Sequence, residues 1–199
     1  MATSIITTPK VVLDLTTHHT NMEHGNRYFI FINDGTKTEG PELYGNLIAS
    51  AQKKIIVWDP YLYHLDMELM KHIRYPISLI ILTSGSAQKW NQKRDSLINE
   101  LKRHVSSSLK SDVSVQIGYI DTDTHGTSKW NCHDRFLMID DSEYFLIGSS
   151  MAHHRSLLSS TGILHVEHSE DKELINKAFY KVYNEAMSKR WISYYENLN

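Results

Sequence analysis

The sequence predicts an α/β fold in which a mixed, mostly parallel sheet is flanked by helices. Three observations support this prediction. Short apolar runs rich in β-branched residues recur along the chain, segments with helical apolar spacing separate several of them, and two apolar runs flank one tight turn. Strands that alternate with helices are typical of a layered sheet with parallel pairs, and the tight turn adds an antiparallel hairpin.

The N-terminal half is expected to begin with two strands and to continue with a helix, a strand and a short helix. These elements are expected at residues 10–15, 26–34, 41–54, 54–60 and 64–73, in that order. The first helix has Leu43, Leu47 and Ile48 at helical spacing and a basic end. The strand after it, KIIVWDP, is apolar, too short for a helix and stopped by Asp-Pro.

The C-terminal half is expected to hold further strands and two longer helices. Strands are expected at residues 75–86, 112–121, 133–140, 144–150 and 161–167, and helices at 88–110 and 169–198. The helix at 88–110 turns its apolar residues inward and its basic residues outward. The last helix is expected to pack through an apolar stripe made of Leu174, Ala178, Phe179, Val182 and Tyr183.

Length and composition bound the class of protein. A chain of 199 residues with 41% hydrophobic and 10% aromatic residues suits one domain with a sizeable core. We read residues 1–199 as a single domain whose core spans about 40–190, with N-terminal strands within 10–34. The sequence contains no linker, internal repeat or low-complexity tract.

Charge and cysteine content indicate an intracellular protein. The net charge of −2 with neutral histidines counts against nucleic-acid binding by bulk charge, but it leaves a local basic face open. No apolar run approaches the ~18 residues that cross a bilayer, and the first residues lack the pattern of a secretory signal. The single cysteine, Cys132, excludes an internal disulfide and fits a reducing compartment. We therefore expect a cytoplasmic protein.

One stretch, NCHDRFLMIDDSEYFLIGSS at 131–150, combines the residues of a phosphate site. The pleat of a strand puts His133 and Arg135 on one face, and the next run ends in Gly148, Ser149 and Ser150. If the two strands pair across the turn, a guanidinium, an imidazole and two hydroxyls converge. The plainer alternative is an ordinary hairpin with polar ends, in which the serines cap a turn.

The same residues resemble a known family. The motif reads His133-x-Arg135-x4-Asp140, followed by Gly148-Ser149-Ser150. It resembles the HKD motif of the phospholipase D superfamily, His-x-Lys-x4-Asp followed by Gly-Ser-x-Asn. The likeness covers roughly residues 40–190, which is a single repeat of that fold. It implies that two motifs face each other, that one histidine attacks phosphorus while the other protonates the leaving group, and that no metal or other cofactor is needed. One motif per chain implies a homodimer with the site on its two-fold axis.

The sequence departs from the family pattern in four places. Arg135 replaces the lysine, Met151 replaces the asparagine, and Thr161 lies about where the family often has a glutamate that orients the histidine. The span from Asp140 to Gly148 is also one residue longer than usual. A His-x-Arg version is similar to a divergent branch that is thought to bind membranes rather than hydrolyse anything.

Other residues are candidates for the same cleft. Asp59 and Tyr61 follow a strand at its carboxyl end, where α/β sheets often bind ligands, although a packed strand end explains them slightly better. His153 and His154 come shortly after the motif. A zinc site that adds His165 and His168 to these two is possible by residue type, but it lacks a recognised ligand spacing.

Two functions follow from these residues. The first is a metal-independent phosphodiesterase, most simply a nuclease, with His133 as nucleophile or acid, Arg135 as phosphate clamp and the two serines as donors. The alternative is a catalytically degenerate module that binds nucleic acid, anionic lipid or a protein partner, and a phage or defence setting is one context for it.

Overall fold

The structure is a computed structural model that describes the greater part of the chain. The described residues are 27–31, 39–85, 87–108, 113–121, 134–148, 151, 160–188 and 193–198. The strand predicted at 10–15 lies outside them. None of the described helices is both long and apolar enough to cross a bilayer.

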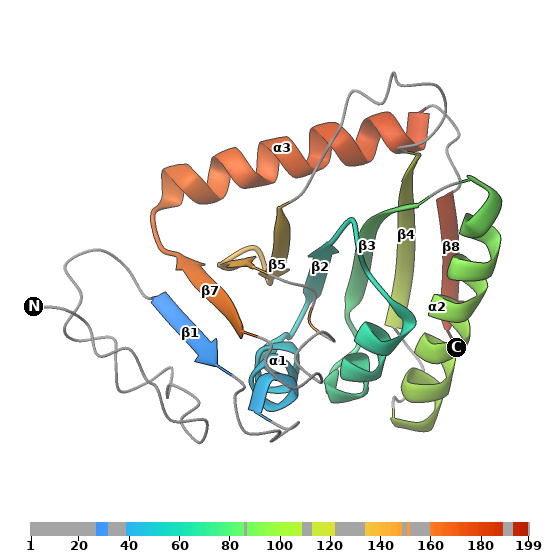
Figure 1. The fold of residues 1–199 in the computed structure, drawn as a ribbon, viewed down its shortest axis with the longest axis horizontal. Helices are drawn as coiled ribbons and strands as arrows, with labels where there is room; N and C mark the ends of the chain where they lie inside the picture. The colour runs from blue at the N-terminus through green and yellow to red at the C-terminus, as the bar shows by residue number, and fades with distance from the viewer. Residues whose placement is uncertain are drawn as a thin grey trace, which may run out of the picture.

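The described strands form one eight-stranded sheet in the order β1-β7-β6-β5-β2-β3-β4-β8 (Figure 1). The strands are β1 (Arg27–Phe31), β2 (Lys54–Trp58), β3 (Ser78–Gly85), β4 (Val113–Asp121), β5 (Arg135–Ile139), β6 (Glu143–Ile147), β7 (Ser160–Val166) and β8 (Ser193–Leu198). The helices are α1 (Glu39–Ser50), the 3-10 helix η1 (His64–His72), α2 (Ala87–Ser108) and α3 (Ser169–Ser188). The predicted mixed α/β sheet is confirmed, with most element bounds within a few residues.

The sheet is less parallel than predicted. Parallel pairing is confined to β2 with β3 and β3 with β4. The other neighbouring pairs of described strands are antiparallel. The short turn between β5 and β6 forces an antiparallel pair, because a parallel connection needs a long crossover.

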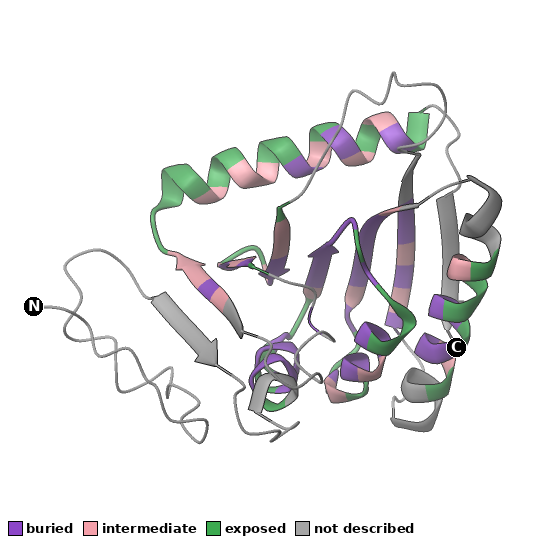
Figure 2. Ribbon diagram, in the orientation of Figure 1, coloured by how far each residue is buried: buried purple, intermediate pink, exposed green. Residues whose placement is uncertain are grey.

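Helices cover both faces of the sheet and make two cores (Figure 2). On one face, buried residues of α1, η1 and α2 pack on the odd-numbered positions of β2, such as Ile55 and Val57. On the other face, Phe179 and Val182 of α3 pack on Ile56 and Trp58. This alternation follows from the two-residue period of a strand, so both faces of β2 are apolar, as the sequence KIIVW predicts.

The prediction for the C-terminal segment is wrong in part. The helix expected at 169–198 ends at Ser188, and β8 pairs antiparallel with β4 from Gly118↔Ser193 to Val113↔Leu198. Tyr-rich SYYENL has good strand propensity, and β4 offers backbone groups that only a further strand can pair. Within α3, Phe179 and Val182 are buried as expected, whereas Leu174 is 64% exposed. Ala178 is exposed as well.

The predicted hairpin is confirmed, with Arg135 paired to Ile147 and Ile139 to Glu143. Asp140 and Asp141 form its turn with φ of 53° and 60°. Aspartate tolerates this left-handed region better than most residues, so the Asp-Asp pair suits the tight turn.

Asp140 also ties the hairpin to the start of β2. Its carboxylate accepts hydrogen bonds from the backbone N–H groups of Gln52 (2.8 Å), Lys53 (2.7 Å) and Lys54 (2.8 Å). Partial burial disfavours the charged carboxylate, but these three donors outweigh that effect and lower the pKa of Asp140 below its ordinary value. The aspartate of the motif thus has a structural role.

We expect Asp140→Asn to lower the free energy of unfolding by about 1–3 kcal/mol at neutral pH, because an amide cannot accept the same charge-assisted bonds. A carboxylate with a lowered pKa in the folded state stabilises the protein above its unfolded pKa, and this contribution is lost as pH falls through the folded pKa. The difference between the variant and the parent, measured by urea denaturation, should therefore shrink below about pH 4.

Asp141→Asn is the matched control. Asp141 lies in the same turn, but its ion pair with Lys54 (2.5 Å) is on the surface, where the Asp141 side chain is 57% exposed. Its replacement should cost less than about 1 kcal/mol. Equal losses for the two variants would contradict the role given to Asp140.

Candidate functional site

The candidate site is built on one row of residues that crosses the sheet. Trp58 pairs with Phe136 of β5 and with Leu82 of β3. The next residue along each strand therefore brings Arg135, Asp59 and Thr83 side by side on the face covered by α1, η1 and α2. This row, which we call the polar row, lies at the carboxyl ends of β2 and β3, where α/β sheets often bind ligands.

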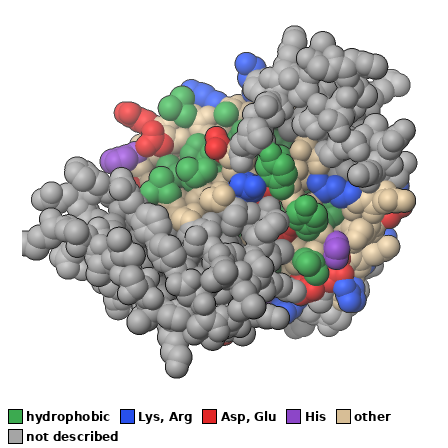
Figure 3. Space-filling model, viewed as in Figure 1, with side chains coloured by type: hydrophobic (Ala, Val, Ile, Leu, Met, Phe, Trp, Pro, Cys, Tyr) green, Lys and Arg blue, Asp and Glu red, His purple; other side chains and the backbone are tan. Residues whose placement is uncertain are grey.

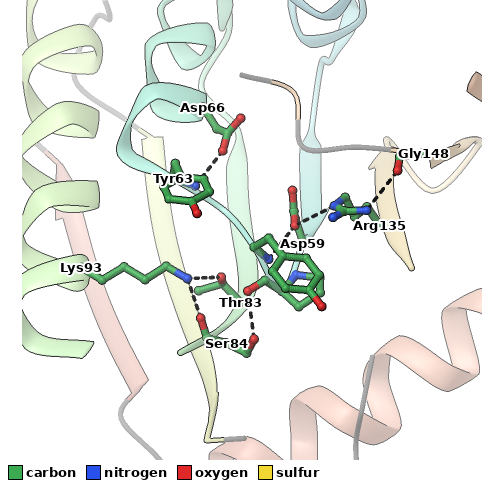
Figure 4. A network of polar contacts seen from close by, with 10 residues as sticks. Asp59, Tyr63, Asp66, Thr83, Ser84, Lys93, Arg135 and Gly148 are labelled. Atoms are coloured by element: carbon green, nitrogen blue, oxygen red, sulfur yellow. Dashed lines mark hydrogen bonds and ion pairs between the residues drawn. The ribbon is translucent and has the colours of Figure 1, made fainter. Parts of the chain in front are cut away.

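Arg135 is held on three sides (Figure 4). Its Nε lies 3.4 Å from Oδ1 of Asp59, and Nη1 donates a hydrogen bond to the carbonyl oxygen of Gly148 (3.1 Å). The guanidinium also lies over the ring of Tyr61, 4.8 Å from its centroid. The side chain is 19% exposed, so the guanidinium is fixed in position and still reached by solvent.

Two buried carboxylates shape the loop between β2 and η1. Asp59 Oδ1 accepts a hydrogen bond from the backbone N–H of Tyr61 (2.7 Å), and Asp66 Oδ2 accepts one from the N–H of Tyr63 (2.7 Å). Asp59 is 3% exposed and Asp66 is completely buried. Burial of Tyr44, reinforced by these two carboxylates, raises the pKa of its hydroxyl. The site is therefore a low-dielectric environment with buried negative charge.

Lys93 of α2 reaches the same edge of the sheet. Its ammonium donates hydrogen bonds to Oγ1 of Thr83 (3.1 Å) and to the carbonyl oxygen of Ser84 (2.5 Å). Burial lowers the pKa of Lys93 to about 8, although Asp59 and Asp66 act in the opposite direction. Sequence reasoning missed this residue. The available signal was its spacing, because positions 93, 97, 100 and 101 share one helix face and the last three are buried.

The structure brings together four of the nine predicted site residues. Arg135, Asp59, Tyr61 and Gly148 contact one another at the polar row. The remaining predicted residues lie outside the described part of the chain, and their roles stay predictions. They are His133, Ser149, Ser150, His153 and His154.

One departure from the family motif, and the motif glycine near it, have a visible structural context. Met151, which stands where the family has asparagine, is 2% exposed and belongs to the larger core. Gly148 donates its N–H to the carbonyl of Gly162 in β7 (2.9 Å), which extends the ladder past β6. The end of the hairpin is thus packed against β7 as well as β5.

Two of the four histidines considered for zinc, His165 and His168, lie in the described part of the chain, and neither is placed in a metal site there. His165 stacks on Phe145 with ring centroids 5.0 Å apart, and its Nε2 lies 2.7 Å from Glu143. His168 is exposed. Among the described residues, no three histidine, cysteine, aspartate or glutamate side chains form a group that could hold a metal ion.

One face of the molecule shows no extended charge of one sign among its described residues. On the face in Figure 3, acidic and basic side chains are interspersed, and acidic ones gather over the first turn of α3, which holds Glu170 and Asp171. Attraction of an anion therefore has to come from individual cations such as Arg135 and Lys93.

The sequence matches no family model and no curated protein. The structure is similar to those of phospholipase D family members over most of the chain. NucT from Helicobacter pylori is 14% identical, with a TM-score of 0.49 over 81% of this chain and 96% of that chain. Nuc from Salmonella typhimurium, a phospholipase D family member, is 8% identical, with a TM-score of 0.48 over 82% and 94%.

A further similar structure is that of TrmBL2, an archaeal chromatin protein described as showing a novel mode of DNA binding. It is 11% identical, with a TM-score of 0.46, and it matches 83% of this chain. This chain spans 55% of the length of TrmBL2. The chain is thus similar in structure to these proteins over about four fifths of its length, at identities of 14% or less.

We expect Arg135→Met to destabilise the protein by about 3 kcal/mol, because it removes the ion-pair partner of the buried Asp59 carboxylate. Asp59→Asn removes that carboxylate, so the double variant should be more stable than the sum of the two single effects predicts, by about 1–3 kcal/mol. Chemical denaturation of all four proteins measures this coupling. Additive effects would show that the two side chains do not stabilise each other.

Proposed function

We propose that this protein is a metal-independent phosphodiesterase, most simply a nuclease. The observation that supports it is the placement of Arg135, which joins the start of β5 to the end of β6 through the Gly148 carbonyl. In the sequence, His133 comes two residues before this arginine, and Ser149 and Ser150 follow Gly148 directly. The contact between Arg135 and Gly148 therefore joins two points of the chain, and the histidine and the two hydroxyls of the motif follow or precede these points by one or two residues.

The proposed reaction has two steps. An imidazole nitrogen of His133 attacks the phosphorus of a phosphodiester, and the bond from phosphorus to the leaving oxygen breaks as that oxygen takes a proton. Water then attacks the phosphohistidine, which releases the phosphate monoester and the free imidazole. Arg135 binds the non-bridging oxygens, on which negative charge accumulates in the transition state.

Preorganisation favours this role for Arg135. A guanidinium that already rests on the Tyr61 ring and is bonded to the Gly148 carbonyl loses little further freedom when an anion binds. An arginine also stays charged at any physiological pH. The substitution of arginine for the family lysine thus keeps the charge and adds a planar fork.

We further propose that the active species is a homodimer. The resemblance gives one motif per chain, whereas the reaction needs both a nucleophile and an acid for the leaving group. A second copy related by a two-fold axis supplies the second histidine from the same position. Each chain then contributes one His133 and one Arg135 to a shared site.

A second candidate function is binding without hydrolysis. The ion pair between Arg135 and the buried Asp59 favours it, because Asp59 offsets part of the charge that would stabilise the transition state. In this case the same pocket recognises an anion on nucleic acid, on lipid or on a protein, and no bond is broken.

We expect the purified protein to cleave single- or double-stranded DNA, RNA or bis(p-nitrophenyl) phosphate in the presence of EDTA, and His133→Ala to be inactive on the same substrates. A phosphohistidine mechanism requires the imidazole but no metal, so chelation leaves the rate unchanged. Gel assays and release of p-nitrophenolate measure the activity.

The control separates chemistry from binding. Asp141→Asn, which changes a surface carboxylate outside the polar row, should retain parental activity. An inactive parent that still binds oligonucleotides in an Arg135-dependent way identifies the binding module instead. Activity that disappears in EDTA would overturn the proposed mechanism.

Mixing subunits tests the shared site. When wild-type and His133→Ala chains are refolded together, random dimers should be active only if both chains are wild type. Activity then falls with the square of the wild-type fraction, whereas independent sites give a linear decrease. Sedimentation velocity on the same mixtures establishes that dimers form, and a monomeric active protein would contradict the shared site.

A further inference from the structure

Lys93 has no role in the motif, yet it contacts Thr83 of the polar row to which Arg135 belongs. Its ammonium is bonded to Thr83, which stands next to Asp59 across β3 and β2. Ser84, whose carbonyl it also contacts, donates its hydroxyl to the carbonyl of Pro60 (2.9 Å). Lys93 is therefore connected to the Asp59–Tyr61 turn that holds Arg135.

The two cations flank one carboxylate. In the view of Figure 4, Asp59 lies between Lys93 and Arg135. Asp59 pairs with Arg135 and also acts electrostatically on Lys93. The backbone positions of Arg135 and Thr83 are two strand spacings apart, about 10 Å. Asp59 acts on both cations, so a phosphate at each of them, rather than one phosphate shared by both, keeps the carboxylate out of the contact.

A plain structural role for Lys93 is counter-ion to Asp59 and Asp66. The balance of effects on its ammonium speaks against this role. Burial is the largest effect and lowers the pKa of Lys93, and the two carboxylates do not compensate for it. In the free protein, the charged ammonium is therefore held at a net energetic cost. A bound anion removes this cost, because its negative charge stabilises the ammonium form of Lys93.

We propose that Lys93 binds a second phosphate group of a polynucleotide strand, next to the phosphate that Arg135 contacts. The inference rests on the proposed function of the polar row as a phosphodiester site. An ammonium has three N–H donors. Among the described residues Thr83 and Ser84 take two of them, and the third can donate to a phosphate oxygen. Lys93 is then a binding residue that fixes the register of the strand.

The proposal gives the binding a distinct pH dependence. A bound phosphate favours the ammonium and raises the pKa of Lys93 above its value of about 8 in the free protein. Binding then takes up a proton when the free lysine is neutral. The affinity for the phosphate is therefore highest below about pH 8, and it falls as pH rises above this value.

The charged groups that the structure describes around Lys93 are two buried carboxylates and one ion pair on its own helix. Asp59 comes from the loop after β2 and Asp66 from η1, and both are carboxylates. Thr83 and Ser84 of β3 are uncharged. On α2 itself, Arg94 and Asp95 pair with each other at 2.9 Å.

Binding to short oligothymidylates tests the proposal in a His133→Ala background, which prevents hydrolysis. The probes are a thymidine dinucleotide with one phosphodiester and a trinucleotide with two, and isothermal titration calorimetry at pH 7 and pH 9 measures the affinity. We expect Lys93→Met to weaken trinucleotide binding about tenfold or more at pH 7 and to leave dinucleotide binding unchanged.

Two further variants sharpen the test. Lys93→Arg keeps a charge that does not titrate, so it should bind the trinucleotide equally well at both pH values, while the parent weakens at pH 9. Lys177→Met is the matched control, because it removes the same charge from an exposed site on α3, where the side chain is 70% exposed. It should bind like the parent.

Each outcome separates this inference from the proposed function. Trinucleotide binding that depends on Arg135 but not on Lys93 overturns the inference and leaves the phosphodiester site standing. Lys93-dependent binding by a protein without nuclease activity supports the inference and overturns the proposed catalysis. A parent that binds neither probe overturns both.

Thermal denaturation excludes the counter-ion role. If Lys93 only neutralises Asp59 and Asp66, Lys93→Met should lower the melting temperature and leave oligonucleotide affinity unchanged. We expect the opposite, a melting temperature equal to that of the parent or higher, together with weaker binding.

Discussion

The site depends on the pairing of β2 with β5, which places Arg135 opposite Asp59. A carboxylate that is 3% exposed is stable as an anion only beside a cation or several donors, and Arg135 together with the Tyr61 amide meets that need. The loop that follows β2 is shaped by the same carboxylate. Once this pair is made, the guanidinium, the Tyr61 ring and the end of β6 have little freedom left.

The spacing of the motif has a mechanical explanation in this structure. Arg135 and Asp140 lie at opposite ends of β5, and each is bonded to the corresponding end of β2. Asp140 binds the backbone of residues 52–54 before β2, and Arg135 binds Asp59 after it. The interval between the two motif residues is therefore the length of one short strand, and the hairpin is fastened to its neighbour at both ends.

The polar row also has an energetic cost that an apolar row would avoid. Asp59 and Thr83 of this row, with Asp66 and Lys93 close by, follow rows of β2 and β3 that are entirely aliphatic or aromatic. Burial of charge without full compensation lowers stability, and such arrangements concentrate at functional sites. This reasoning joins the proposed phosphate clamp at Arg135 to the proposed second contact at Lys93.

Local pattern by itself determined the strands of the central sheet, the two-sided apolar character of β2, and the hairpin, because each depends on residues close together in the chain. It also indicated which side chains of the motif share a face. Only the tertiary structure decided that Asp59 and Arg135 are neighbours, that Asp140 binds the backbone before β2, and that Lys93 reaches the same edge. These contacts join segments far apart in the sequence, and their register is set by strand pairing. The same reason explains the error at the C-terminus, where the open edge of β4 selects a strand over the continuation of a helix.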